Sequence, residues 1–148
     1  MKIGLIGAGR LGLCLALLME EAGYDVIASD IRVDYIDSLN RKVIDTTEPE
    51  VKELLKNSRN IYFTNSNLEV IDEADIIFTL VQTPSLEDGR YDVSDVDDVI
   101  SDVLKYAWIN PNSPHKSIVI GCTTNPGDCD FFENRLSETG FDLFLSLI

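Results

Sequence analysis

The chain begins with a short apolar run that leads directly into a glycine-rich turn. Residues 3–6 (Ile-Gly-Leu-Ile) have the apolar character of a buried strand, and residues 7–12 read Gly-Ala-Gly-Arg-Leu-Gly. In a strand–turn–helix unit the first glycine allows the tight turn, the second lets a pyrophosphate approach the backbone, and the third lets the helix lie close to the sheet. We therefore predict a phosphate cradle at Gly7, Gly9 and Gly12, with the first amides of the following helix facing the anion.

An acidic residue stands at the position where a dinucleotide site needs one. The run 24–29 reads as a second strand and ends directly before Asp30. At this spacing a carboxylate meets the ribose of adenosine, accepts hydrogen bonds from its hydroxyls and repels a 2′-phosphate. We expect NAD to be bound in preference to NADP, unless Arg32 compensates the charge. The alternative role of Asp30 is to cap the helix that begins near Val33.

Predicted strands and helices alternate along the whole chain. The strands are expected at residues 3–6, 24–29, 61–64, 76–81, 118–121 and 141–147. The helices are expected at residues 11–19, 33–40, 50–56, 68–73, 94–108 and 128–139. Pro49 is expected in the first turn of its helix, Ser66 or Asn67 as one cap and Ser94 as another. This pattern predicts an α/β fold, a Rossmann-type doubly wound parallel sheet with helices on both faces, formed by one domain over residues 1–148.

Four glycine or polar residues follow the predicted strands directly. They are Gly7, Asp30, Thr83 and Thr123. Ligands of doubly wound sheets lie beyond the carboxyl ends of the strands, so these residues should converge on one edge. For Thr83 the alternative is a hydroxyl that only satisfies the turn before Pro84.

Charge and cysteine content exclude several other classes of function. The formal net charge of −14 argues against nucleic acid or an anionic membrane as a partner, although backbone amides can still hold a pyrophosphate. No metal site is expected, because Cys14, Cys122 and Cys129 form no Cys-x-x-Cys pair and the single histidine is His115. The apolar runs are no longer than strands and the first strand leaves no room for a signal peptide, so we expect no membrane span and a cytoplasmic location.

Several segments resemble the UDP-glucose/GDP-mannose dehydrogenase family, in the family's order. Residues 74–84 (ADIIFTLVQTP) are similar to its fourth strand and the turn that follows, and Asp88-Gly89 continues the match. Glu50 replaces a glycine of the family's E-P-G-L segment. The matching segments are residues 48–55, 60–64, 74–84, 88–96 and 122–127.

The resemblance implies an NAD-dependent oxidoreductase that converts the C6 alcohol of a nucleotide sugar to a carboxylate in two steps. Arg10-Leu11 replaces the family's Tyr-Val, and Tyr35, with Arg32 nearby, takes the place of its usual basic residue. Thr123 matches a threonine near the nicotinamide whose hydroxyl helps to hold the reaction water, which gives it a latent catalytic role. The cofactor-binding residues are then expected to be Gly7, Gly9, Arg10, Leu11, Gly12, Asp30, Tyr35, Val81, Thr83 and Thr123.

The family's catalytic Lys, Asn and Cys lie beyond the strand that matches residues 141–146. We therefore expect either a fragment of a longer enzyme or a relative that keeps only the cofactor half, which would bind a nucleotide sugar only when the missing half is supplied. Cys122 has no basic neighbour in sequence to activate it, so the chain alone is not expected to oxidise sugars. One alternative is a stand-alone, non-catalytic dinucleotide-binding or sensing module. Another is a methyltransferase, whose fold also places glycines after its first strand and an acid after its second.

Overall fold

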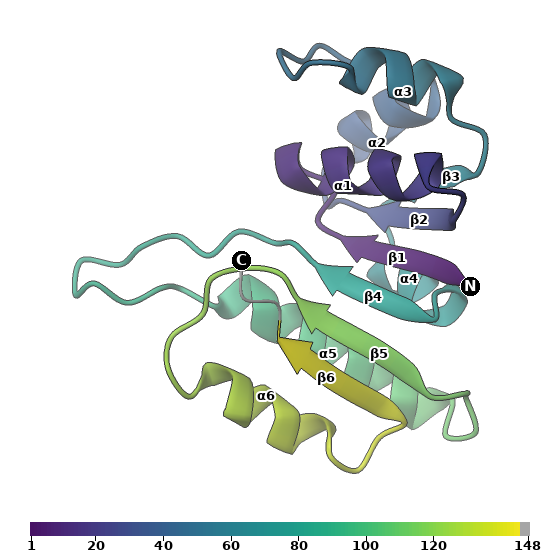
Figure 1. Ribbon diagram of the computed structural model, residues 1–148. Helices are drawn as coiled ribbons and strands as arrows, with labels where there is room; N and C mark the ends of the chain where they lie inside the picture. The colour runs from purple at the N-terminus through teal and green to yellow at the C-terminus, as the bar shows by residue number, and fades with distance from the viewer. Residues whose placement is uncertain (146–148) are drawn as a thin grey trace.

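A six-stranded sheet runs through the computed structural model of the chain, which describes residues 1–145 (Figure 1). Its strands are β1 (Lys2–Ile6), β2 (Asp25–Ser29), β3 (Ile61–Thr64), β4 (Ile76–Thr79), β5 (Lys116–Ile120) and β6 (Phe141–Leu145). The helices are α1 (Arg10–Glu21), α2 (Val33–Asn40), α3 (Val51–Asn57), α4 (Asn67–Glu73), α5 (Ser94–Ile109) and α6 (Asp128–Leu136).

The strand order is β3-β2-β1-β4-β5-β6, and every neighbouring pair is parallel. This is the predicted Rossmann-type doubly wound sheet. The order reverses between β1 and β4, which is the position where such sheets bind ligands. Because the strands are parallel, their carboxyl ends meet at one edge, and in Figure 1 the arrowheads point to the side on which the long loop after β4 extends.

Two hydrophobic clusters cover the two faces of the sheet. Ile3 and Leu5 of β1 belong to the cluster formed with α1, α2 and α3, whereas Ile6 belongs to the cluster formed with α4, α5 and α6. The strands supply both clusters because successive side chains of a strand point to opposite faces. This arrangement confirms that helices lie on both faces.

Two element ends differ from the prediction for reasons that the structure shows. β4 ends at Thr79 rather than at residue 81, because its neighbour β1 ends at Ile6. Pro49 is not in the first turn of α3: Glu50 is the N-cap and has a left-handed φ of 65°, so the helix begins only at Val51.

Two cap predictions had different outcomes. Ser66 caps α4, since its side chain accepts a hydrogen bond from the Glu69 amide. Ser94 is the first residue of α5 and not its cap, because the N-cap is Val93 and has no capping side chain. At the end of the chain α6 stops at Leu136 rather than 139, and the last two residues of the predicted strand 141–147 lie outside the described part.

No helix within residues 1–145 is both long enough and apolar enough to cross a membrane.

Candidate functional site

The glycine turn after β1 is fastened to the end of β2. Gly7 has a φ of 101°, a conformation that favours glycine. The amides of Gly7 and Ala8 both donate to the carbonyl oxygen of Ser29, at 2.9 and 2.8 Å. The turn therefore has a fixed position at the carboxyl edge of the sheet.

The two other glycines of the motif have opposite surroundings. A Cβ on Gly12 would fall on the carbonyl oxygen of Gly7, so a side chain there would push α1 away from the turn. A Cβ on Gly9 would meet nothing within 4 Å, which leaves the space above the turn open. Gly12 thus serves close packing, while Gly9 keeps the approach to the backbone clear.

The N-terminus of α1 is suited to an anion. Gly9 is its N-cap, no side chain caps the helix, and its first turn contains no acidic residue. The first amides of a helix have no intrahelical acceptor and stand at the positive end of the helix dipole. Together with the open space above Gly9, these amides fit the pyrophosphate of a dinucleotide.

A cavity of about 350 Å³ lies on the β2 side of the turn. Arg10 at the start of α1 forms an ion pair with Glu48 from the loop between α2 and α3. Arg32 and Tyr35 also line this cavity. The other lining residues are Leu13, Cys14, Ile44, Asp45, Thr46, Thr47 and Val51.

Asp30 follows β2 and is held by Arg32. The guanidinium donates to both carboxylate oxygens, from Nε to Oδ1 and from Nη2 to Oδ2, each at 2.8 Å. Burial alone would raise the pKa of Asp30, but the hydrogen bonds and the charge of Arg32 outweigh it and hold the pKa below its ordinary value. Asp30 is therefore an ionised carboxylate with its charge already paired.

A second cavity, of about 260 Å³, lies on the β4 and β5 side of the turn. Cys122 lines it, and burial raises the pKa of this thiol to about 11, so the thiol is neutral near pH 7. Thr123 beside it is exposed, and Thr83 is half-buried. The lining residues are Leu11, Leu80, Val81, Thr83, Gly121, Cys122 and Thr123.

The predicted site residues thus occupy one strip along the carboxyl edge of the sheet. The glycine turn is in the middle, Arg10 and Tyr35 line the cavity on one side, and four predicted residues line the other. Those four are Leu11, Val81, Thr83 and Thr123. Asp30 lines neither cavity but contacts Arg32, which does line one.

Some residues of these cavities were absent from the predicted set. Arg32 stands only two positions after Asp30, and this spacing was a usable signal for a charge pair. Glu48 had no such signal, because its contact with Arg10 depends on how the loop between α2 and α3 folds back over α1. Within the described residues no group of three or more His, Cys, Asp or Glu side chains is arranged to hold a metal ion.

The sequence matches one family model and several curated proteins over nearly its whole length. The model of the UDP-glucose/GDP-mannose dehydrogenase family, NAD binding domain, matches residues 1–143. A UDP-glucose 6-dehydrogenase of Rickettsia prowazekii is 34% identical over 144 residues, which cover 95% of this chain and 32% of that protein. The chain spans about a third of the length of the UDP-glucose 6-dehydrogenases that it matches.

Solved structures of similar fold include two nucleotide-sugar dehydrogenases. The GDP-mannose dehydrogenase of Pseudomonas aeruginosa superposes with a TM-score of 0.86 at 22% identity, over 98% of this chain and 35% of that one. The UDP-D-ManNAc dehydrogenase of Pyrococcus horikoshii superposes with a TM-score of 0.81 at 25% identity, over 100% of this chain and 37% of that one.

Proposed function

Because the chain belongs to the UDP-glucose/GDP-mannose dehydrogenase family and matches its NAD-binding domain, we propose that it supplies the cofactor half of a nucleotide-sugar 6-dehydrogenase. In the complete enzyme the C6 alcohol of the sugar would be oxidised to a carboxylate. NAD supplies the hydride acceptor for such a reaction. The role of this chain is to bind and orient that cofactor.

The observation that carries the proposal is the open, uncapped N-terminus of α1 between two cavities. The amides that follow Gly9 have neither a capping side chain nor an acidic neighbour in the first turn. A pyrophosphate held there would direct one half of the dinucleotide to each side. The position of the two cavities on opposite sides of the turn supports this orientation.

Each predicted residue then has a role. Gly7 and Gly12 shape the turn, and Gly9 admits the pyrophosphate. On the β2 side Asp30 would bind the adenosine ribose, with Tyr35 and Arg10 beside it. On the β4 and β5 side Leu11, Val81 and Thr83 would contact the nicotinamide half. Thr123 is exposed, and its hydroxyl would face the reacting end and hold water there.

We expect sugar oxidation only when a substrate-binding part completes the site. Two-step oxidation needs a general base for the alcohol and a nucleophile for the aldehyde. The thiol of Cys122 is neutral because its pKa is raised to about 11, so it does not supply that nucleophile. A nucleotide sugar is therefore a partner of the completed enzyme, whereas nucleic acid is not an expected partner of so acidic a chain.

A non-catalytic NAD-sensing module would contain the same phosphate cradle. The two roles can be distinguished by supplying a substrate-binding domain. A dehydrogenase would then oxidise the sugar, whereas a sensing module would not. The cytoplasm, where NAD-dependent sugar metabolism would occur, is the location that we propose for either role.

The binding function is tested by calorimetric titration of the chain with NAD. Gly9→Val should abolish binding, because the branched side chain fills the open space above the turn. Gly140→Val is the matched control: its added Cβ has only the Ser113 carbonyl oxygen near it, at 3.8 Å, so binding should be retained. If Gly9→Val binds NAD as tightly as the parent chain, the pyrophosphate does not lie over Gly9.

A further inference from the structure

The carboxylate of Asp30 has one acceptor position left for a ribose hydroxyl. Oδ1 accepts from both the backbone amide and Nε of Arg32, at 3.0 and 2.8 Å, and Oδ2 accepts from Nη2 at 2.8 Å. Each carboxylate oxygen has two lone pairs. Oδ1 is therefore fully occupied and Oδ2 has one place free. The side chain is only 8% exposed, so little water screens the pair.

Arg32 is also held from its other side, by an aromatic ring. Its guanidinium carbon lies 4.2 Å from the centroid of the Tyr35 ring, within the range of a cation–π contact. Tyr35 is half-buried, and α2 begins directly after Arg32. The guanidinium is thus fixed between a carboxylate and a ring rather than free in solution.

Arg32 retains hydrogen-bond donors that point to no protein partner among the described residues. An arginine side chain has five N–H groups, and the carboxylate of Asp30 uses one on Nε and one on Nη2. The side chain is 57% exposed and lines the cavity on the β2 side. The other charged groups of this cavity are Arg10, which is paired with Glu48, and Asp45.

We propose that Arg32 sets the cofactor choice of this site and allows it to accept a 2′-phosphate, so that the chain binds NADP within tenfold of NAD. The repulsion that an isolated Asp30 would exert on the phosphate is cancelled by a guanidinium bonded directly to it. The unused N–H groups of that guanidinium are donors of the geometry that phosphate oxygens accept. This inference rests on the proposed function, in which the adenosine half lies on the β2 side.

The test is calorimetric titration of the full chain with NAD and, separately, with NADP. In the parent chain the two dissociation constants should differ by less than tenfold. Arg32→Ala should raise the ratio of the NADP constant to the NAD constant at least tenfold, mainly by weakening NADP. Arg32→Gln keeps most of the side-chain length without the charge and should raise the ratio in the same way. This variant replaces Arg32→Ala in the test if the alanine variant folds poorly.

Arg41→Ala is the matched control, because it removes an arginine near the other end of α2 whose Nε donates to the Asp37 carbonyl oxygen. The ratio of its NADP dissociation constant to its NAD dissociation constant should equal that of the parent chain. Adenosine 2′,5′-bisphosphate and AMP should reproduce the same ratios, since they contain only the adenosine end of each cofactor. A parent chain that prefers NAD by more than tenfold, or a ratio unchanged in Arg32→Ala, overturns the proposal while leaving the NAD site intact. Binding of neither dinucleotide would overturn the proposed function as well.

Discussion

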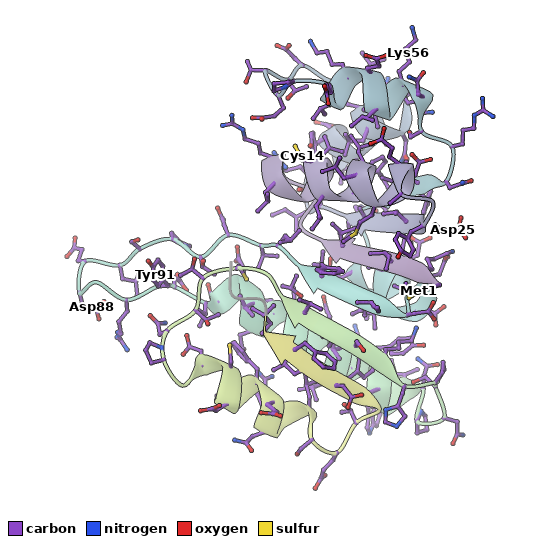
Figure 2. The ribbon with its side chains drawn as sticks, in the orientation of Figure 1. Met1, Cys14, Asp25, Lys56, Asp88 and Tyr91 are labelled. Carbon is purple, nitrogen blue, oxygen red and sulfur yellow. The ribbon has the colours of Figure 1, made fainter. Side chains whose placement is uncertain are left out.

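The side-chain amide of Asn125 pairs with the backbone of Tyr91 as one strand pairs with another. Nδ2 of Asn125 donates to the Tyr91 carbonyl oxygen at 2.9 Å, and the Tyr91 amide donates to Oδ1 of Asn125 at 2.8 Å. Asp128 fixes the amide in turn, since its Oδ2 accepts from the backbone and the side chain of Asn125, each at 2.8 Å. The long loop after β4, on which Tyr91 and Asp88 lie (Figure 2), is thereby attached to the loop after β5 beside the second cavity.

Removing this attachment should free the loop. Asn125→Ala deletes both hydrogen bonds, and we expect local opening to become easier by about 1–3 kcal/mol. Tryptic cleavage after Arg90 should then be roughly tenfold faster or more, measured by mass spectrometry under native conditions. Asn112→Ala, in an exposed turn, is the control and should leave the rate unchanged. A rate within twofold of the parent for Asn125→Ala would show that other contacts hold the loop.

Gly4→Ala should destabilise the fold without touching the site. An added Cβ at Gly4 would lie 2.7 Å from both Cβ of Ala74 and Cγ1 of Val70, so α4 would have to move away from β1. Overpacking of this kind costs about 1–3 kcal/mol. Urea denaturation should show the loss for Gly4→Ala and almost none for Gly140→Ala, whose added atom has an ordinary contact. Equal stability of the two variants would mean that α4 adjusts freely.

Tyr106 should make stability depend on pH in the alkaline range. Burial, with the hydrogen bond that its hydroxyl donates to Asp72 at 2.8 Å, raises the pKa of Tyr106 from 10 to about 12. The unfolded chain loses this proton first, so the contribution of Tyr106 is complete below pH 10 and is lost as the pH rises toward 12. Tyr106→Phe should therefore be less stable than the parent by about 1 kcal/mol at pH 8. The difference should shrink by pH 11, as measured by urea denaturation, and a constant difference would contradict this assignment.

Cys122 should be a poor nucleophile at neutral pH. Burial raises the pKa of its thiol to about 11, with the nearby Cys129 as a smaller cause. Alkylation by iodoacetamide, followed by mass spectrometry in a variant with Cys14 and Cys129 changed to Ser, should accelerate about tenfold per pH unit between pH 7 and 10.

Because the thiol of Cys122 is neutral, we predict that the chain produces no NADH from NAD and UDP-glucose or GDP-mannose. Absorbance of NADH over time measures this. Sustained turnover that disappears in Cys122→Ala would make Cys122 a catalytic nucleophile and refute the prediction.

The sequence was informative where local patterns determine structure. The alternation of apolar runs with helical segments predicted the order of the elements and the parallel sheet, and the glycine spacing located the turn. Element ends were less predictable. β4 stops where its neighbour β1 stops, so its end is determined by strand pairing and not by the character of residues 80–81. The pairing of Arg10 with Glu48 could not be predicted from the sequence either, since it depends on a loop that brings residues far apart in sequence into contact.

The strand order has a consequence for how the chain folds. Within each half of the sheet, β1-β2-β3 and β4-β5-β6, neighbouring strands are also consecutive in sequence. The join between the halves is long-range: near it, the Lys2 amide donates to a carboxylate oxygen of Asp75, 73 positions along the chain. Closing so long a loop is entropically costly before its contacts form, so we expect the halves to form first and the β1–β4 pair last. Gly7 stands at this join, where a Cβ would lie 2.6 Å from the Leu80 carbonyl oxygen. The contact of Leu80 with the glycine turn is therefore expected to form only in the final step of folding.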